Sequence, residues 1–116
     1  MAHLPQLDRA IVSETKMVNY LLSARHPNGR AKARFLASFG FRVEEWRVLR
    51  DAVIAHARIN NITASHLTRF GTRYAIDGPL QTPDGRVPIV RVIWFIELQE
   101  SIPRLVTLVP RIVTHD

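Results

Sequence analysis

The chain has 116 residues, of which 47% are hydrophobic and 22% are charged, and it contains no cysteine. This length predicts a single domain over residues 1–116 with one hydrophobic core. The absence of cysteine excludes disulfides, thiolate nucleophiles, zinc–thiolate sites and iron–sulfur clusters. No apolar run is long enough to cross a membrane and the N-terminus lacks the pattern of a signal peptide, so a cytoplasmic protein without a membrane partner is predicted.

The formal net charge of +6 comes from one part of the chain. Residues 15–43 contain no Asp or Glu but hold six basic residues, namely Lys16, Arg25, Arg30, Lys32, Arg34 and Arg42. The other ten basic residues are matched by ten acidic ones, and fourteen of all sixteen are Arg, which suits bidentate contact with phosphate. We therefore expect RNA or another phosphate-bearing ligand as a partner, with a solvated basic surface as the alternative.

The first half of the chain predicts helices. Leu4–Val12, called the lead-in below, is predicted to be an extended segment whose end can form an edge strand or a docking arm. Ser13 is a suitable N-cap for the first helix, and Gly40 is a natural C-terminal stop for the second. The spacing of apolar residues predicts three helices, over Glu14–Ser23, from Gly29 or Arg30 to Phe39, and over Glu44–Arg58.

The second half alternates apolar and polar residues and predicts strands. The expected strands are Ile62–Phe70, Thr72–Leu80, Val87–Leu98 and Arg104–Val109. Val87–Leu98 is apolar on both faces, so it should be a central strand with Trp94 in the core. The prediction is an α+β fold in which three helices, packed on one face, precede a four-stranded antiparallel β-meander.

The segment from His26 to Phe35 holds the first group of candidate site residues. Lys32 falls within the apolar stripe of its helix, where an ammonium needs a partner or must reach past the helix end to water. Arg30 and Arg34 fall on the opposite, solvent-facing side. The backbone amides of Gly29 and Arg30 should be free at the helix start, where they would favour an anion. His26, beside these cations, is expected to stay neutral and would suit a general base, or it is only a turn residue.

The strands supply a second group of candidates, which are polar residues in otherwise apolar segments: Tyr74, Arg91, Arg104 and Thr107. Arg91 shares a face with Ile89 and Ile93, so it needs a counter-ion. Asp77 or Glu97 in a structural ion pair is the favoured partner, and a bound anion is the alternative. The five histidines lack metal-binding spacing, so no metal or cofactor is predicted.

Several short motifs are spread along the chain. They are Leu4-Pro5, Tyr20-Leu21-Leu22, His26-Pro27 with Gly29-Arg30 and Lys32-Ala33, Gly78-Pro79-Leu80, Pro83-Asp84-Gly85, Val90 to Ile96, and Pro103 to Thr107. Together they resemble an uncharacterised bacterial family of domains of unknown function with the motifs HPxGRxKAxxF, GPLxxPDG, VRTVWFI and PRLVT. The resemblance covers nearly the whole chain and implies no particular reaction. It implies occurrence in toxin-like and phage-associated proteins, and the element order looks like that of barnase, EndoU, colicin and RelE ribonucleases.

Two hypotheses follow from these residues. In the first, the domain binds or cleaves RNA by metal-independent acid–base chemistry, with catalytic His26, Lys32, Tyr74 and Thr107, and with Gly29, Arg30, Arg34, Arg91 and Arg104 binding phosphate. In the second, it is a non-catalytic protein-interaction or immunity-like accessory module whose charges form structural pairs. Convergence of Lys32, Arg91, Arg104 and Thr107 around one pocket with a bound sulfate or phosphate would favour the first hypothesis, and separate, satisfied ion pairs would favour the second.

Overall fold

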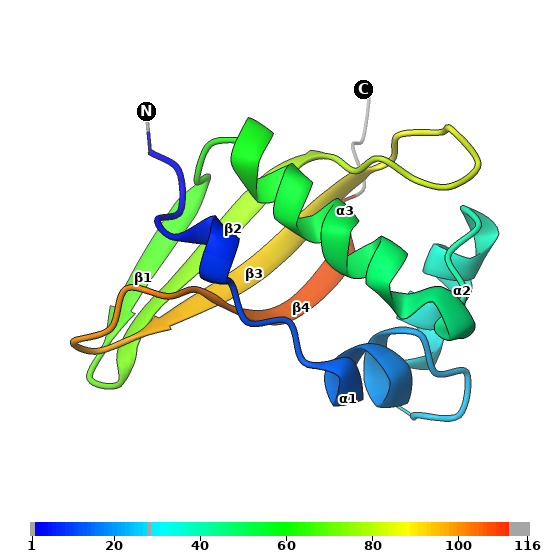
Figure 1. Cartoon of the computed structure of the whole chain (residues 1–116), viewed down its shortest axis with the longest axis horizontal. Helices are drawn as coiled ribbons and strands as arrows, with labels where there is room; N and C mark the ends of the chain where they lie inside the picture. The colour runs from blue at the N-terminus through cyan, green and yellow to red at the C-terminus, as the bar shows by residue number, and fades with distance from the viewer. Residues whose placement is uncertain (1, 28, 112–116) are drawn as a thin grey trace, which may run out of the picture.

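The computed structural model describes residues 2–27 and 29–111 and has its helices before its strands (Figure 1). The helical elements are η1 (Leu7–Arg9), α1 (Glu14–Lys16), η2 (Met17–Leu21), α2 (Arg30–Ser38), η3 (Val43–Glu45) and α3 (Trp46–Ile59). The strands are β1 (Ala64–Thr68), β2 (Gly71–Pro79), β3 (Ile89–Glu97) and β4 (Arg104–Pro110). The predicted α+β class and element order are confirmed. None of the described helices is long and apolar enough to span a membrane.

The strands form one antiparallel sheet in the order β1-β2-β3-β4, so β3 is an inner strand as predicted. α3 crosses one face of this sheet (Figure 1). The residues of β3 that face the helices are fully or almost fully buried, namely Val90, Val92, Trp94 and Ile96. The core therefore lies between α3, the N-terminal helices and this face of the sheet.

An extra residue interrupts the pairing of β4 with β3. Trp94 lies opposite Leu105, but the preceding residue of β3, Ile93, lies opposite Thr107, so Val106 is the bulged residue. The bulge explains why Leu105 and Leu108 are both buried although they are three residues apart. It also leaves Thr107 on the same face as Ile93, away from the Trp94 side of the sheet.

The predicted first helix contains a change of helix type. Ser13 caps it as expected, since its Oγ accepts a hydrogen bond from the Lys16 amide at 3.2 Å. After Lys16 the backbone widens into a π-helical turn, in which the Leu22 amide donates to the Met17 carbonyl at 2.8 Å. π-helical turns are rare and are often found at functional sites. This turn carries Tyr20.

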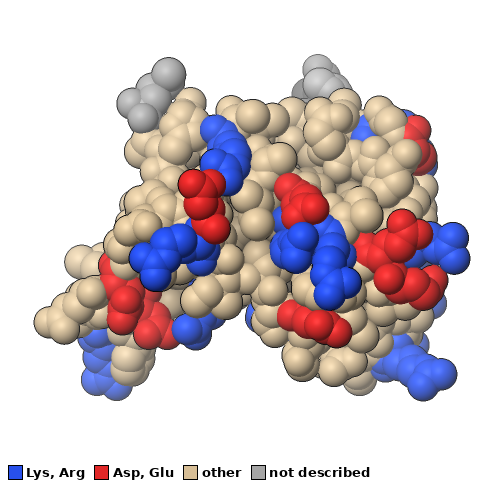
Figure 2. Space-filling model, viewed as in Figure 1, with Lys and Arg blue, Asp and Glu red and all other residues tan. Residues whose placement is uncertain are grey.

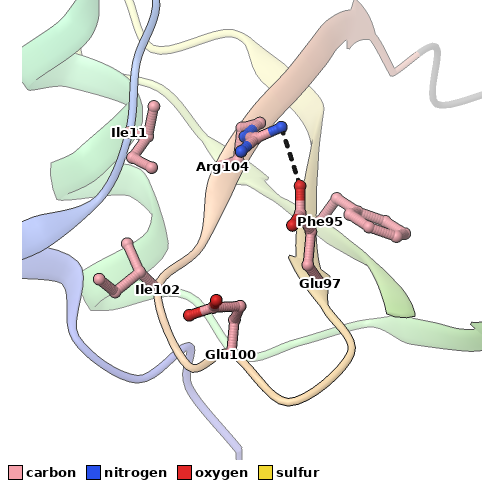
Figure 3. Close-up of a pocket in the computed structure, with 6 residues that line it drawn as sticks. All are labelled: Ile11, Phe95, Glu97, Glu100, Ile102 and Arg104. Atoms are coloured by element: carbon pink, nitrogen blue, oxygen red, sulfur yellow. Dashed lines mark ion pairs between the residues drawn. The ribbon is translucent and has the colours of Figure 1, made fainter. Parts of the chain in front are cut away.

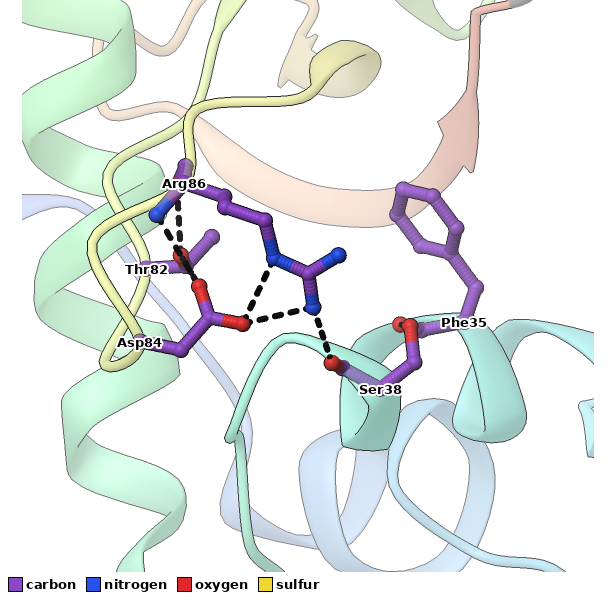
Figure 4. Close-up of polar contacts among 5 residues, drawn as sticks. All are labelled: Phe35, Ser38, Thr82, Asp84 and Arg86. Carbon is purple, nitrogen blue, oxygen red and sulfur yellow. Dashed lines mark hydrogen bonds and ion pairs between the residues drawn. The ribbon is translucent and has the colours of Figure 1, made fainter.

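The loop between β2 and β3 anchors the C-terminal end of α2 (Figure 4). The Arg86 guanidinium donates to the Ser38 carbonyl at 2.6 Å and to the Asp84 carboxylate at 2.6 and 2.8 Å. It also lies 4.3 Å from the centre of the Phe39 ring. The same Arg86 lowers the pKa of the Asp84 carboxyl to about 2. Arg86 thus ties α2 to the sheet at the end of the helix opposite to its predicted anion-binding start.

The lead-in contacts the edge of β4. Ile11 donates its amide to the Pro103 carbonyl at 2.9 Å and accepts the Leu105 amide at 2.9 Å, which makes a single parallel bridge to Arg104. The expected edge strand is thus one bridge long, and the lead-in acts as a short docking arm.

Candidate anion-binding site

Lys32 projects from α2 towards β4 and the π-helical turn. Its Nζ donates to the Tyr20 hydroxyl at 2.7 Å and to Thr107 Oγ1 at 2.9 Å. All three side chains are half-buried. These contacts join residues that are 12 and 75 positions apart in the chain, so only the tertiary fold assembles the group. Two of the predicted site residues, Lys32 and Thr107, therefore meet.

The Lys32 ammonium has no counter-ion in the described part of the chain. Its two hydrogen-bond partners are neutral hydroxyls, and none of the ion pairs of the structure includes it. A half-buried cation without a carboxylate is stabilised by an incoming anion, since the anion supplies the missing charge. The geometry therefore suits a small negative group held by one ammonium and two hydroxyls.

Tyr20 also belongs to this site, although its sequence pattern indicated only a place in the apolar stripe of the first helix. The hydrogen bond from Lys32 lowers the pKa of its phenol, with further lowering by Thr107 and by the positive charge of Lys16. The His26 ring meets the Tyr20 ring edge-on, with 4.9 Å between the ring centres. A tyrosine on an apolar helix face needs a hydrogen-bond partner for its hydroxyl. This need, together with the need of Lys32 for a partner, was the sequence feature that could have linked the two residues.

Gly29 is buried beneath the π-helical turn and has a packing role. A Cβ at this position would collide with the Tyr20 carbonyl oxygen and approach its ring carbon Cδ1 to 3.2 Å. The Gly29 amide, which was expected to be free for an anion, donates to the His26 carbonyl at 3.1 Å. Gly29 thus lets α2 approach Tyr20 closely, which brings Lys32 within hydrogen-bonding distance of the phenol.

The four arginines predicted to bind phosphate differ in their exposure and in their ion pairs. Arg30 and Arg34 are exposed on α2, as expected, and form no ion pair with any described residue. They stand on the helix that carries Lys32, where long, mobile side chains can reach a larger anion.

Arg91 forms the structural ion pair that the sequence favoured. Its Nε and Nη2 donate to the two oxygens of Asp77 at 2.7 and 2.8 Å. The hydrogen bond with Arg91 lowers the pKa of Asp77, and Arg111 lies 3.5 Å from the same carboxylate. Arg91 faces the same side of the sheet as Thr107, but among the described residues no hydrogen bond or ion pair joins it to Lys32.

Arg104 lies in a separate hollow of about 180 Å³ beside the turn between β3 and β4 (Figure 3). Its Nη1 pairs with Glu97 Oε1 at 3.1 Å. Glu100 and the apolar side chains of Ile11 and Ile102 line the same hollow. The structure therefore does not bring Arg104 to the Lys32 site.

Tyr74 is also separate from Lys32. It lies in β2 between Ser65 of β1 and Trp94 of β3, and it packs against the buried core. The phenol that Lys32 contacts is that of Tyr20. Among residues 2–27 and 29–111 no group of three or more His, Asp or Glu side chains could hold a metal ion.

The charge on the face that carries α3 is mixed. Figure 2 shows Lys and Arg side chains beside Asp and Glu side chains there, with no broad region of one sign. A preference for an anion at Lys32 would therefore come from the local site and not from a continuous basic patch on this face.

Comparison with known proteins gives a family and a fold. A family model described as a domain of unknown function (DUF6883) matches residues 3–112. A solved structure of a contact-dependent growth inhibition toxin - immunity protein complex from Klebsiella pneumoniae 342 contains a chain with the same fold, at a TM-score of 0.70 and 14% identity. The match covers 88% of this chain and 100% of that chain. No curated protein sequence matches this chain significantly.

Proposed function

This chain belongs to the family of domains of unknown function DUF6883, and we propose that it binds RNA and cleaves it without a metal ion at the site formed by Lys32, Tyr20, Thr107 and His26. The observation that carries the proposal is the Lys32 ammonium, which is half-buried, bonded to two neutral hydroxyls, and without a carboxylate partner in the described chain. A phosphodiester of RNA supplies the single negative charge that this arrangement lacks.

The composition supports a polyanionic ligand over a small one. The net charge is +6, and Arg30 and Arg34 stand exposed on the helix that carries Lys32. Extra cations next to a phosphate site raise the affinity for a chain of phosphates, because each one neutralises a further group. The structural neighbour belongs to a toxin–immunity protein complex, which supports a toxin-like or immunity-like role by analogy of fold alone.

The proposed chemistry is an internal transesterification. The ribose 2′-oxygen attacks the adjacent phosphorus, His26 accepts the 2′-hydroxyl proton, and the bond to the 5′-oxygen breaks. Tyr20, whose pKa is lowered by Lys32, donates its proton to the departing 5′-oxygen. Lys32 and the Thr107 hydroxyl hold the two non-bridging oxygens, where negative charge grows during the reaction. The products are a 2′,3′-cyclic phosphate and a 5′-hydroxyl.

A cleavage assay in the presence of EDTA tests this function. Purified protein is incubated with total transfer RNA, and the new ends are examined for 2′,3′-cyclic phosphate. Lys32→Met should lower the cleavage rate by about 10²–10³-fold, the usual effect of removing one group that stabilises transition-state charge. Thr107→Val should also lower the rate, whereas the matched control Thr72→Val, a half-buried threonine of β2, should cleave like the wild type.

Two outcomes count against RNA cleavage. They are an absence of cyclic-phosphate ends with the wild-type protein, and a Lys32→Met variant that is as active as the wild type. The non-catalytic protein-interaction module is then the better reading, and the observation that favours it is that Arg91 and Arg104 are already in ion pairs with Asp77 and Glu97.

A further inference from the structure

A second hollow, of about 540 Å³, lies on the sheet face opposite to α3. The turn between β1 and β2 and the strands β3 and β4 form it, with Phe70, Phe95 and Val106 as apolar walls and His66, Arg69 and Arg73 around them. In Figure 1 this turn and α2 lie at opposite ends of the molecule. None of the residues that line the hollow belongs to the Lys32 site.

The hollow is preformed because one position of the sheet has no side chain. Gly71 pairs with Thr68 on one side and with Glu97 on the other, at a φ of +149°. A Cβ there would approach the Phe95 ring carbon Cζ to 2.8 Å, so the ring lies directly against the glycine. This contact fixes Phe95 as a wall of the hollow.

Exposed apolar side chains gather at the same end of the sheet. Phe70 and Leu98 are 66% and 60% exposed. The two turns that carry Phe70 and Leu98 are joined, because the Leu98 amide donates to the Phe70 carbonyl at 3.0 Å. Apolar side chains that cluster in this way on a folded domain are typical of protein–protein contact surfaces.

The charges around the hollow are positive and unpaired within the described chain. Arg69 and Arg73 take part in none of the ion pairs, and the Arg69 guanidinium lies 4.9 Å from the centre of the Phe70 ring. The nearest carboxylate in the ladder, Glu97, is paired with Arg104. A partner with carboxylates around an apolar side chain would complement both features.

We propose that this end of the sheet is the docking surface for an acidic protein segment, with an apolar side chain in the hollow and carboxylates on Arg69 and Arg73. A protein fits better than RNA for two reasons. Val106 offers no flat face on which a base can stack, and both aromatic rings already have contacts, Phe70 with the Arg69 guanidinium and Phe95 with Gly71. This surface is independent of RNA cleavage, since the two sites share no residue.

The test is a titration of the 116-residue protein, followed by two-dimensional NMR. The probe is a short synthetic peptide with a Leu-Phe pair flanked by glutamates, and the comparison ligands are the same peptide with lysines and a uridine oligonucleotide. The acidic peptide should give saturable shifts of amides in residues 66–73 and 95–98. Arg69→Glu should weaken this binding about tenfold, because it places a like charge against the glutamates. The matched control is Arg47→Glu on α3, where an exposed arginine also lies 4.9 Å from the centre of an aromatic ring.

Phe70→Ser, with Ile59→Ser as the control at another exposed apolar position, tests the apolar contact in the same way. Circular dichroism of each variant confirms that it folds. The proposal is overturned if the acidic peptide gives no saturable shifts at the hollow, if the lysine peptide binds as well, or if the oligonucleotide shifts the same amides more strongly. Because cleavage is measured separately, failure of this docking surface leaves the assay of Lys32 unaffected.

Discussion

Replacing Lys32 by methionine separates a binding role from a structural one. Methionine keeps the length of the side chain and removes the charge and both hydrogen bonds. If Lys32 serves an absent anion, the variant should lose RNA binding and cleavage while the fold keeps its stability.

The structure gives the size of the stability change. The Nζ atom makes two hydrogen bonds, at 2.7 and 2.9 Å, and each bond that involves a charged group contributes about 1.5–3 kcal/mol. Against this, an ammonium that is partly removed from water without a counter-ion costs several kcal/mol. The hydroxyls of Tyr20 and Thr107 are half-buried, so water can replace Lys32 as their partner. The two effects nearly cancel, and the expected change in the free energy of unfolding is within about 1 kcal/mol.

Urea unfolding at neutral pH measures this change, and the same preparations are used for RNA binding and cleavage. A Lys32→Met variant that is destabilised by more than about 2 kcal/mol would refute the argument, since Lys32 would then hold α2 to β4 as a structural residue. A Lys32→Met variant of unchanged stability that still binds and cleaves RNA would refute the proposed role of Lys32 in RNA binding and cleavage.

Three further outcomes follow from contacts described above. Asp77→Asn should lower the free energy of unfolding by roughly 1–3 kcal/mol in urea titrations, because it leaves the Arg91 guanidinium without its charged partner. Burial lowers the pKa of His56 in the folded state, so the His56 side chain binds a proton more tightly in the unfolded chain. The free energy of unfolding in urea should therefore fall as the pH drops below about 6.5, and His56→Gln should reduce this fall. Gly29→Ala should destabilise the fold by about 1–3 kcal/mol, because its Cβ collides with the Tyr20 backbone, and should alter the Tyr20 absorbance titration; unchanged values would contradict the packing role of Gly29.

Much of the fold follows from local patterns. The two-sided apolar run of β3 predicts an inner strand, and Gly40 and Asn60 mark helix ends within one or two residues of where α2 and α3 stop. The bulge at Val106 was not predictable from alternation, because a bulge changes the parity that alternation assumes. The burial of His56 was not predicted either, because it depends on a contact between distant parts of the chain. Its Nε2 lies 3.1 Å from the Gly78 carbonyl, and that partner belongs to a strand 22 residues away.

The candidate site was predictable in part. Lys32 stood out because a charged residue within an apolar stripe needs a partner, and the structure pairs it with one residue of the predicted set, Thr107. Tyr74 was favoured over Tyr20 because polar residues are conspicuous in strands, whereas a tyrosine in a helix reads as part of the core. The partner of Arg91 was predictable because Asp77 and Arg91 lie opposite each other in a regular hairpin ladder. The partner of Lys32 depends on how α2 docks at the sheet, which no local pattern describes.

The bridge between Ile11 and β4 also bears on how copies of this chain avoid one another. β4 is an edge strand, and unpaired backbone groups on an edge strand can recruit a strand from another molecule. By bonding to Pro103 and Leu105, Ile11 occupies these groups at the start of β4. A chain that lacks the lead-in would expose them next to the apolar side chains of Leu105 and Ile102, and it should self-associate at concentrations where the intact protein stays monodisperse.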